Sequence, residues 1–235
     1  MVLFVLLGIA VIALAHTAPA PFILDAMAGD TAVWHMPRGL PPTVYLTFDD
    51  GPNPSTTPDL LDVLAREDVP ATFFLIDEHI TDETAPIVRR ILADGHAVGL
   101  HSRTRADVLR SPADLKQKLT AAAQRIERLA GMAPCRAFRP HAGWRSVAMY
   151  RALDLLGYRL AGWSWGLWDW NWFRRPEAEH LARRLAKKTS RGDIIVLHDG
   201  HHVDPAPDRR YAIEATRQLV PALKQRGFDF GRLCY

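Results

Sequence analysis

Two adjacent carboxylates, Asp49 and Asp50, follow a stretch of β-branched and aromatic residues at 43–48 and precede a Gly-Pro pair. Neighbouring carboxylates repel each other, so the arrangement is costly unless a cation or a shared proton relieves the repulsion. A strand end holds the backbone rigid while the following loop presents the side chain, and α/β proteins keep catalytic groups there. The pair therefore indicates a metal-binding or acid–base site, although Asp and Gly-Pro taken alone are also ordinary turn residues.

Other polar residues of catalytic types stand in the same position relative to the strands that the pattern predicts. They are His101, Arg139, Asp169 with Trp170, and His198 with Asp199. Each of them taken alone is more typical of a structural residue. Because the carboxyl ends of successive parallel strands meet on one rim of a barrel, their shared position predicts that these groups converge there.

The chain alternates short β-branched or aromatic runs with amphipathic stretches from Thr43 onward. Strands are expected at 43–48, 71–76, 97–101, 136–139, 159–165, 193–198 and 227–230, and helices at 57–67, 82–93, 112–130, 146–156, 176–188 and 209–224. The Ser111-Pro112 pair marks a helix start, and glycines such as Gly131 mark helix ends. The alternation predicts parallel βα units in one domain at 43–235, and therefore either an α/β barrel or a doubly wound sheet.

The polar residues at these strand ends fall into motifs that resemble those of the NodB-like polysaccharide deacetylases of carbohydrate esterase family 4, over residues 43–233. The matching runs are Thr47-Phe48-Asp49-Asp50-Gly51-Pro52, His101-Ser102, Arg139-Pro140-His141-Ala142-Gly143, Asp169-Trp170 and Leu197-His198. The first run is matched without change, whereas the third is matched loosely. The resemblance implies a distorted (β/α)7 barrel that hydrolytically removes N-acetyl groups from a peptidoglycan-like or chitin-like glycan.

The resemblance also implies a role for each matched residue. The implied catalytic residues are Asp49 as base, His198 as general acid, Asp169 as the partner that keeps His198 protonated, and Arg139 as the partner of Asp49. Asp50 and His101 would hold a divalent metal, either zinc, cobalt, manganese or nickel, which can polarise the carbonyl and acidify its bound water. The implied substrate-binding residues are Ala142, through its backbone N–H at the oxyanion, Trp144, Trp170 and Leu197.

Arg105 departs from the family pattern, in which a second metal-binding histidine follows the first by four residues. A guanidinium has no free lone pair and stays protonated, so it cannot replace an imidazole ligand. Three readings are open: Arg105 turns into solvent beside a weak metal site, it replaces the metal as a fixed charge facing Asp50, or the chain binds sugar without turnover. The histidines that could fill the gap are His141, ranked first, and His96, His201 and His202.

These readings correspond to different functions. The favoured one is a metal-assisted glycan deacetylase, and the alternatives are a non-catalytic carbohydrate-binding relative and a metal-independent amidase or deformylase acting on a lipid-linked sugar. The tryptophan-rich run at 163–173 is compatible with core packing or with a platform on which sugar rings stack. The scattered arginines and the formal charge of +3 indicate a solvated surface and no nucleic-acid partner.

The N-terminus is almost purely apolar from residue 2 to residue 15, which is shorter than the ~20 residues of a membrane span. Residues 1–20 are therefore expected to be a signal peptide or a membrane anchor, followed by a linker at 21–42. This predicts a secreted or membrane-anchored protein facing outward in the cell envelope. Cys135 and Cys234 are compatible with one disulfide or with two free thiols.

Overall fold

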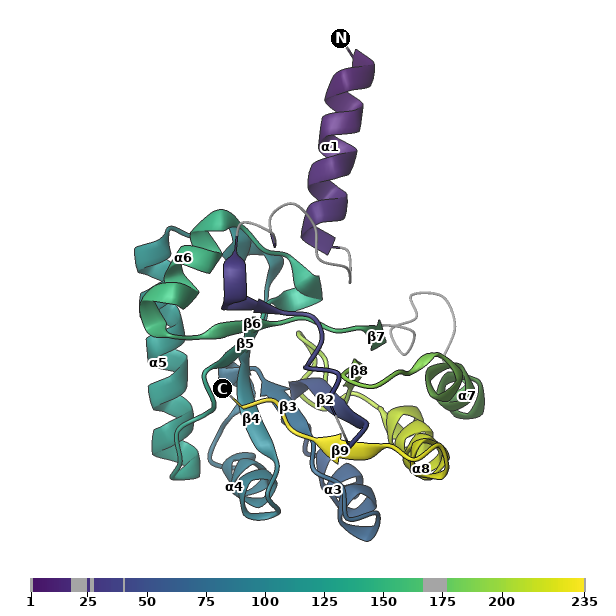
Figure 1. Cartoon of the computed structure of the whole chain (residues 1–235). Coiled ribbons are helices and arrows are strands. Elements are labelled where there is room, and N and C mark those ends of the chain that lie inside the picture. The colour runs from purple at the N-terminus through teal and green to yellow at the C-terminus, as the bar shows by residue number, and fades with distance from the viewer. Residues whose placement is uncertain (1, 18–24, 26–27, 40, 167–176, 235) are drawn as a thin grey trace.

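A sheet of parallel strands forms the centre of the domain (Figure 1). The computed structural model describes residues 2–17, 25, 28–39, 41–166 and 177–234. In these residues the strands run in the order β1-β6-β5-β4-β3-β2-β8-β7, with β9 beside β2, and all of these pairings are parallel. The strands are β1 (Ala32–Val33), β2 (Thr43–Gly51), β3 (Thr72–Leu75), β4 (Ala97–His101), β5 (Ala137–Arg139), β6 (Arg159–Ala161), β7 (Trp165–Gly166), β8 (Ile194–His198) and β9 (Asp229–Gly231).

Helices pack around the outside of this sheet (Figure 1). They are α3 (Thr57–Arg66), α4 (Ala85–Ala93), α5 (Pro112–Ala130), α6 (Val147–Leu156), α7 (Ala178–Lys188) and α8 (Arg210–Gln225), with short 3-10 turns η1 (Gly29–Thr31), η2 (Asp77–His79), η3 (Arg105–Leu109) and η4 (His141–Gly143). The expected end signals of α5 are confirmed. Ser111 Oγ accepts a hydrogen bond from the Asp114 N–H, and Gly131 ends the helix in the left-handed region at φ 81°.

The central strands are buried because helices and connecting segments cover the sheet. All residues of β3, β4, β5 and β8 are buried, as expected of a parallel sheet whose crossover helices lie against it. Phe48 and Phe73 stack across β2 and β3 with 5.2 Å between ring centroids. The sheet curls, and the α/β barrel predicted from the sequence is confirmed in preference to the doubly wound sheet.

The strand expected at 159–165 is present as two short strands at opposite ends of the sheet order. β6 pairs with β5, whereas β7 pairs with β8. Between them, the Gly162 N–H donates to the Val33 carbonyl, and a Cβ at Gly162 would lie only 2.2 Å from the ring of Trp34. Glycine therefore lets the chain pass close to the Trp34 ring between β6, beside the edge strand β1, and β7, at the other end of the sheet order.

The segment at 21–42, expected to be a linker, is built into the domain where the structure describes it. β1 pairs with β6, and Trp34 is 5% exposed and packs at a tilt against Trp163. Asp25 is also buried and forms a 2.6 Å ion pair with Arg145. The linker prediction was wrong here because a two-residue strand is too short to produce a detectable periodicity.

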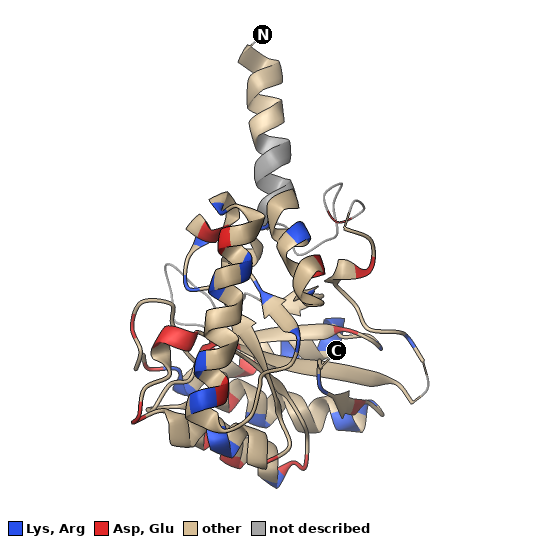
Figure 2. Ribbon diagram, turned by 90° about the vertical axis from the view of Figure 1, so that its left-hand side faces the viewer, with Lys and Arg blue, Asp and Glu red and all other residues tan. Residues whose placement is uncertain are grey.

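Helix α1 (Val2–Thr17) extends away from the barrel and contains no Lys, Arg, Asp or Glu (Figure 2). Its large apolar side chains from Val2 to Ile9 are exposed. Charged residues of both signs are interspersed over the helices of the barrel in the same view. Among the described residues, no helix has both the length and the apolar character needed to cross a membrane.

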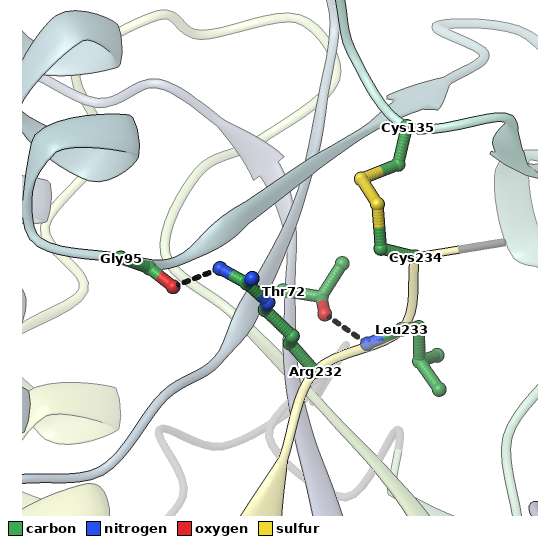
Figure 3. Close-up of a disulfide and its surroundings, with 6 residues drawn as sticks. All are labelled: Thr72, Gly95, Cys135, Arg232, Leu233 and Cys234. Atoms are coloured by element: carbon green, nitrogen blue, oxygen red, sulfur yellow. Dashed lines mark hydrogen bonds between the residues drawn. A yellow bond between two sulfur atoms is a disulfide. The ribbon is translucent and has the colours of Figure 1, made fainter.

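A disulfide between Cys135 and Cys234 joins the C-terminal tail to the segment before β5 (Figure 3). Two hydrogen bonds hold the same tail: the Leu233 N–H donates to Thr72 Oγ1 at 2.8 Å, and Arg232 donates to the Gly95 carbonyl at 2.6 Å. The two cysteines are 99 residues apart in sequence, so the bond closes a long loop. The alternative of two free thiols is thereby excluded.

Breaking this bond should destabilise the barrel, because a cross-link over a long loop restricts the unfolded chain most strongly. We expect Cys135→Ser with Cys234→Ser to lower the free energy of unfolding by roughly 2–4 kcal/mol in urea titrations. A reductant should lower the stability of the wild type by a similar amount and leave the double variant unchanged. Equal stability of the oxidised and reduced wild type would show that the tail is held by Leu233 and its hydrogen bonds alone.

Candidate metal centre and active site

The polar residues that the sequence placed at strand ends come together at the carboxyl end of the barrel. Asp49 and Asp50 lie at the end of β2, His101 is the last residue of β4, and His198 is the last residue of β8. The register pairs Asp49 with His198, and His101 with Arg139. The convergence predicted from parallel topology is therefore confirmed for these residues.

Arg139 holds Asp49 in a buried ion pair. Its Nη1 lies 2.6 Å from Asp49 Oδ1 and 2.7 Å from Thr47 Oγ1. Its Nε and Nη2 donate to the carbonyls of Ala161 and Gly162 at 3.0 and 2.9 Å, and the guanidinium stands 4.0 Å from the centroid of the Phe74 ring. Because these acceptors surround a side chain with no exposed surface, the orientation of the Asp49 carboxylate is fixed.

A second cluster, next to this pair, has the composition of a metal site. One ligand atom from each of Asp50, His101 and His141 lies within 4.8 Å of the others, and all three residues are buried. His101 Nε2 is 3.2 Å from Asp50 Oδ1, which is buried and makes no hydrogen bond to the described residues. A divalent cation would satisfy this oxygen, and one carboxylate with two imidazoles is a donor set that suits zinc, cobalt, manganese or nickel. The residues therefore fit a metal.

His141 reaches this cluster because the loop after β5 is tied to the loop after β4. The His141 N–H donates to Ser102 Oγ at 2.7 Å, and the Ser102 N–H donates to the Arg139 carbonyl at 3.2 Å. The turn continues through Ala142 at φ 53°, an uncommon conformation for a residue other than glycine, and Gly143 at φ 72°. A Cβ at Gly143 would lie 2.8 Å from the Trp163 ring, so glycine is needed at this position.

Arg105 does not face Asp50. Its side chain is exposed at the start of η3, and its guanidinium lies over the Trp144 ring, 5.9 Å from the ring centroid. This is the geometry of the reading in which Arg105 turns away from the metal site. His141 occupies the gap that Arg105 leaves in the donor set, as its rank among the candidate histidines anticipated.

The other candidate histidines have different surroundings. His96 stands just before β4, at the opposite end of that strand from His101, and its Nδ1 accepts the Ala71 N–H at 3.1 Å, so its selection as a replacement ligand was wrong. His201 Nδ1 accepts the N–H groups of Val203 and Asp204, as in an exposed loop turn. His202 packs against His141 with 4.5 Å between ring centroids, outside the cluster of three.

The pKa values of Asp50 and His141 favour the protonation states that bind a metal. Burial alone would raise the pKa of Asp50, but His101 in close contact, with His198 and His141 nearby, holds it well below its usual range. Burial and the neighbouring His101 lower the pKa of His141 to about 3. At neutral pH Asp50 is therefore ionised and His141 is neutral, and these are the protonation states in which both groups bind metals.

Asp199 is a buried carboxylate that the sequence placed at the rim beside His198 but to which it assigned no specific role. Thr57 Oγ1 donates to its Oδ2 at 2.5 Å, and burial, reinforced by the charges of Asp50 and Asp49, raises its pKa to about 7. Gly200 lets the chain after Asp199 pass close to the backbone of Asp50, since a Cβ at Gly200 would lie 2.1 Å from the Asp50 carbonyl oxygen. The available signal was a second ionisable residue directly after a strand-end histidine.

The remaining predicted site residues are placed as follows. Leu197 is 1% exposed and packs in the hydrophobic core, whereas Trp144 and Ala142 are half-buried beside the metal cluster. Asp169 and Trp170, with the rest of the segment at 167–176, lie outside the described residues. Trp163 is buried in the core, so this part of the tryptophan run packs and is not an exposed platform. The roles of Asp169, Trp170 and Leu197 stay predictions.

Deacetylases from several bacteria are similar to this chain in sequence. A family model described as polysaccharide deacetylase matches residues 38–161, more than half of the chain. A chitooligosaccharide deacetylase of Sinorhizobium fredii is 36% identical over 80% of this chain and 88% of its own length. A peptidoglycan-N-acetylglucosamine deacetylase of Bacillus cereus is 28% identical over 84% of this chain and 88% of its own length.

Solved structures agree with this relationship. The Bc1960 peptidoglycan N-acetylglucosamine deacetylase is 25% identical with a TM-score of 0.77, and the alignment covers 89% of this chain and 94% of that one. A family 4 acetyl xylan esterase from Clostridium thermocellum, in complex with a cobalt ion, is 31% identical with a TM-score of 0.69, covering 81% and 87%. The distorted (β/α)7 barrel is thereby confirmed, and the chain belongs to the polysaccharide deacetylase family.

Proposed function

We propose that this protein is a metal-assisted deacetylase that removes N-acetyl groups from an N-acetylated glycan by hydrolysis. The observation that carries the proposal is the position of the Asp49–Arg139 pair directly beside the Asp50, His101 and His141 cluster. A base beside a metal site on one rim supplies the groups that metal-assisted hydrolysis of an amide uses. The names of the relatives, which are chitooligosaccharide and peptidoglycan deacetylases, supply the substrate class.

Asp49 is suited to act as the base. Its ion pair with Arg139 through Oδ1 orients the carboxylate and leaves the second carboxylate oxygen to accept a proton from an attacking water. A divalent ion held by Asp50, His101 and His141 would act as a Lewis acid for the amide carbonyl. Arg139 thus orients the base Asp49, and Asp49 directly precedes Asp50, the first of the three possible metal ligands.

His198 is suited to donate the proton that the departing amine needs. It is buried at the end of β8, level with Asp49 in the register, so it borders the same site as the base. The Ala142 N–H is the candidate donor to the oxyanion, because its left-handed turn lies beside the metal cluster. Proton transfer by positioned groups of this kind typically contributes 10²–10⁴-fold, so about that range is expected from Asp49 and His198 individually.

Asp49→Asn should reduce acetate release from an N-acetylglucosamine tetramer by about 10²–10⁴-fold, because the amide cannot take a proton from water. Acetate release would be measured on protein loaded with zinc or cobalt, with metal content and thermal unfolding recorded for each variant. Asp154→Asn, on the exposed face of α6, is the matched control and should be fully active. A folded, metal-loaded wild type that releases no acetate from any N-acetylated glycan would refute the proposed function.

His141→Ala should weaken metal binding, since one of three protein ligands is removed. We expect a loss of at least about 10–100-fold in zinc or cobalt affinity, the amount that even an outer-shell partner can contribute. Adding Arg105→His to this variant should restore affinity, because it places an imidazole four residues after His101, where the family pattern has one. Affinity would be measured by competition with a chelator.

His180→Ala, at an exposed position on α7, is the control for loss of an imidazole elsewhere. Unchanged metal affinity in His141→Ala would show that the ligand set does not include His141. Failure of Arg105→His to restore binding, with the wild-type and His141→Ala results as expected, would mean that the loop after β4 no longer reaches the metal.

The protein is further proposed to act outside the cytoplasm. The apolar segment at 2–15 supports an export signal or an anchor, and a disulfide is typical of an oxidising compartment. We expect the full chain to be recovered outside the cytoplasm or bound to the outer face of the cytoplasmic membrane, with both cysteines unreactive to thiol reagents. Deletion of residues 2–17 should leave the chain in the cytoplasm. Recovery of the full chain there, with free thiols, would contradict the proposal.

A further inference from the structure

Two arginines, Arg103 and Arg105, stand in the loop that follows β4 at the rim of the metal cluster. Both are exposed, and neither forms an ion pair with any carboxylate in the described part of the chain. Arg103 Nε donates to the His202 carbonyl at 3.0 Å, which holds this side chain near the histidines of the site. The rim therefore carries positive charge that the described residues do not neutralise by ion pairing.

Arg105 lies close to the metal cluster, because it contacts a residue of the loop that carries His141. Its guanidinium lies 5.9 Å from the centroid of the Trp144 ring, and Trp144 follows directly after η4, which contains His141. Arg105 is thus a rim residue of the site even though it is turned away from Asp50.

The two side chains have complementary binding properties. A guanidinium presents a rigid fork of donors that matches a carboxylate in two parallel hydrogen bonds, and contact with an aromatic face limits its rotation. The half-buried indole offers an apolar face of the kind on which a sugar ring can stack. A neutral glycan would use the indole alone, whereas a glycan with an acidic substituent would use both.

We propose that Arg105 and Trp144 form a subsite that recognises a carboxylate-bearing sugar next to the N-acetyl sugar that is hydrolysed. The inference rests on the proposed deacetylase function and names the glycan that it favours. The substrates in the names of the relatives differ in this respect: chitooligosaccharides are neutral, whereas the glycan of peptidoglycan has a lactyl group on alternate sugars, whose carboxylate is free wherever no peptide is attached to it. The subsite selects the acidic glycan. Arg105, which replaces the second metal-binding histidine of the family pattern, would thereby determine which glycan is preferred.

The test compares two soluble glycans of equal length, an N-acetylglucosamine tetramer and a peptidoglycan tetrasaccharide with free lactyl carboxylates. Arg105→Gln should lower kcat/KM on the acidic tetrasaccharide about 10- to 100-fold more than on the neutral one, since a charged hydrogen-bonded pair is lost. Most of the loss should be in KM, and Arg105→Lys should recover part of it. Amidation of the lactyl carboxylates should remove the difference between wild type and Arg105→Gln.

Arg128→Gln is the matched control, because it removes one positive charge from an exposed position near the far end of α5. It should leave kcat/KM on both glycans unchanged. Equal losses on the two glycans in Arg105→Gln, or no loss on either, would overturn the subsite. A change in metal content of Arg105→Gln would likewise overturn it, because Arg105 would then act through the metal site.

Direct binding separates failure of the subsite from failure of the proposed function. Calorimetric titration with the acidic tetrasaccharide should show tighter binding than with the neutral one, and Arg105→Gln should remove the difference. If the wild type binds in this way but releases no acetate from either glycan, the subsite stands and the deacetylase function fails. If acetate is released and Arg105→Gln binds and turns over both glycans like the wild type, the function stands and the subsite fails.

Discussion

The ion pair between Arg139 and Asp49 is the interaction on which the rest of the site depends. A fully buried guanidinium is tolerated only if its donors are satisfied, and breaking such a pair typically costs about 3–5 kcal/mol. Arg139 satisfies its donors by binding Thr47 and Asp49 of β2 and the carbonyls of Ala161 and Gly162. The same contacts therefore orient the base and join β2 and β5 to the segment that crosses the sheet.

In the candidate metal cluster the third possible ligand comes from the loop after β5, whereas the family pattern has it in the loop after β4. All loops at the carboxyl ends of the strands open onto one rim, so a donor from the loop after β5 can replace a donor from the loop after β4. Ser102 makes the exchange geometrically feasible here, because its hydroxyl accepts the His141 N–H and fixes one loop against the other. Arg105, which stands where the family pattern has its second histidine, lies over the Trp144 ring.

Local sequence was sufficient for most of the elements and for the rim as a whole. Parallel strands buried on both faces and helices with strong caps carry their signal within ten or twenty residues, which is why helix α5 and strand β4 were predicted at their observed bounds. The element predictions were wrong where the periodic pattern was very short or was divided between two strands. Strand β1 has two residues, and the expected strand at 159–165 is divided between two edges of the sheet.

Local sequence patterns were enough to identify the fold class, the family, the rim that carries the chemistry and the candidate residues Asp49, Asp50, His101, Arg139 and His198. The grouping of His141 with Asp50 and His101, the contact of Arg105 with Trp144 and the disulfide became apparent only in three dimensions. The reason is physical. A strand-end position follows from local periodicity, whereas the meeting of two side chains from different loops depends on the register and curvature of the whole sheet.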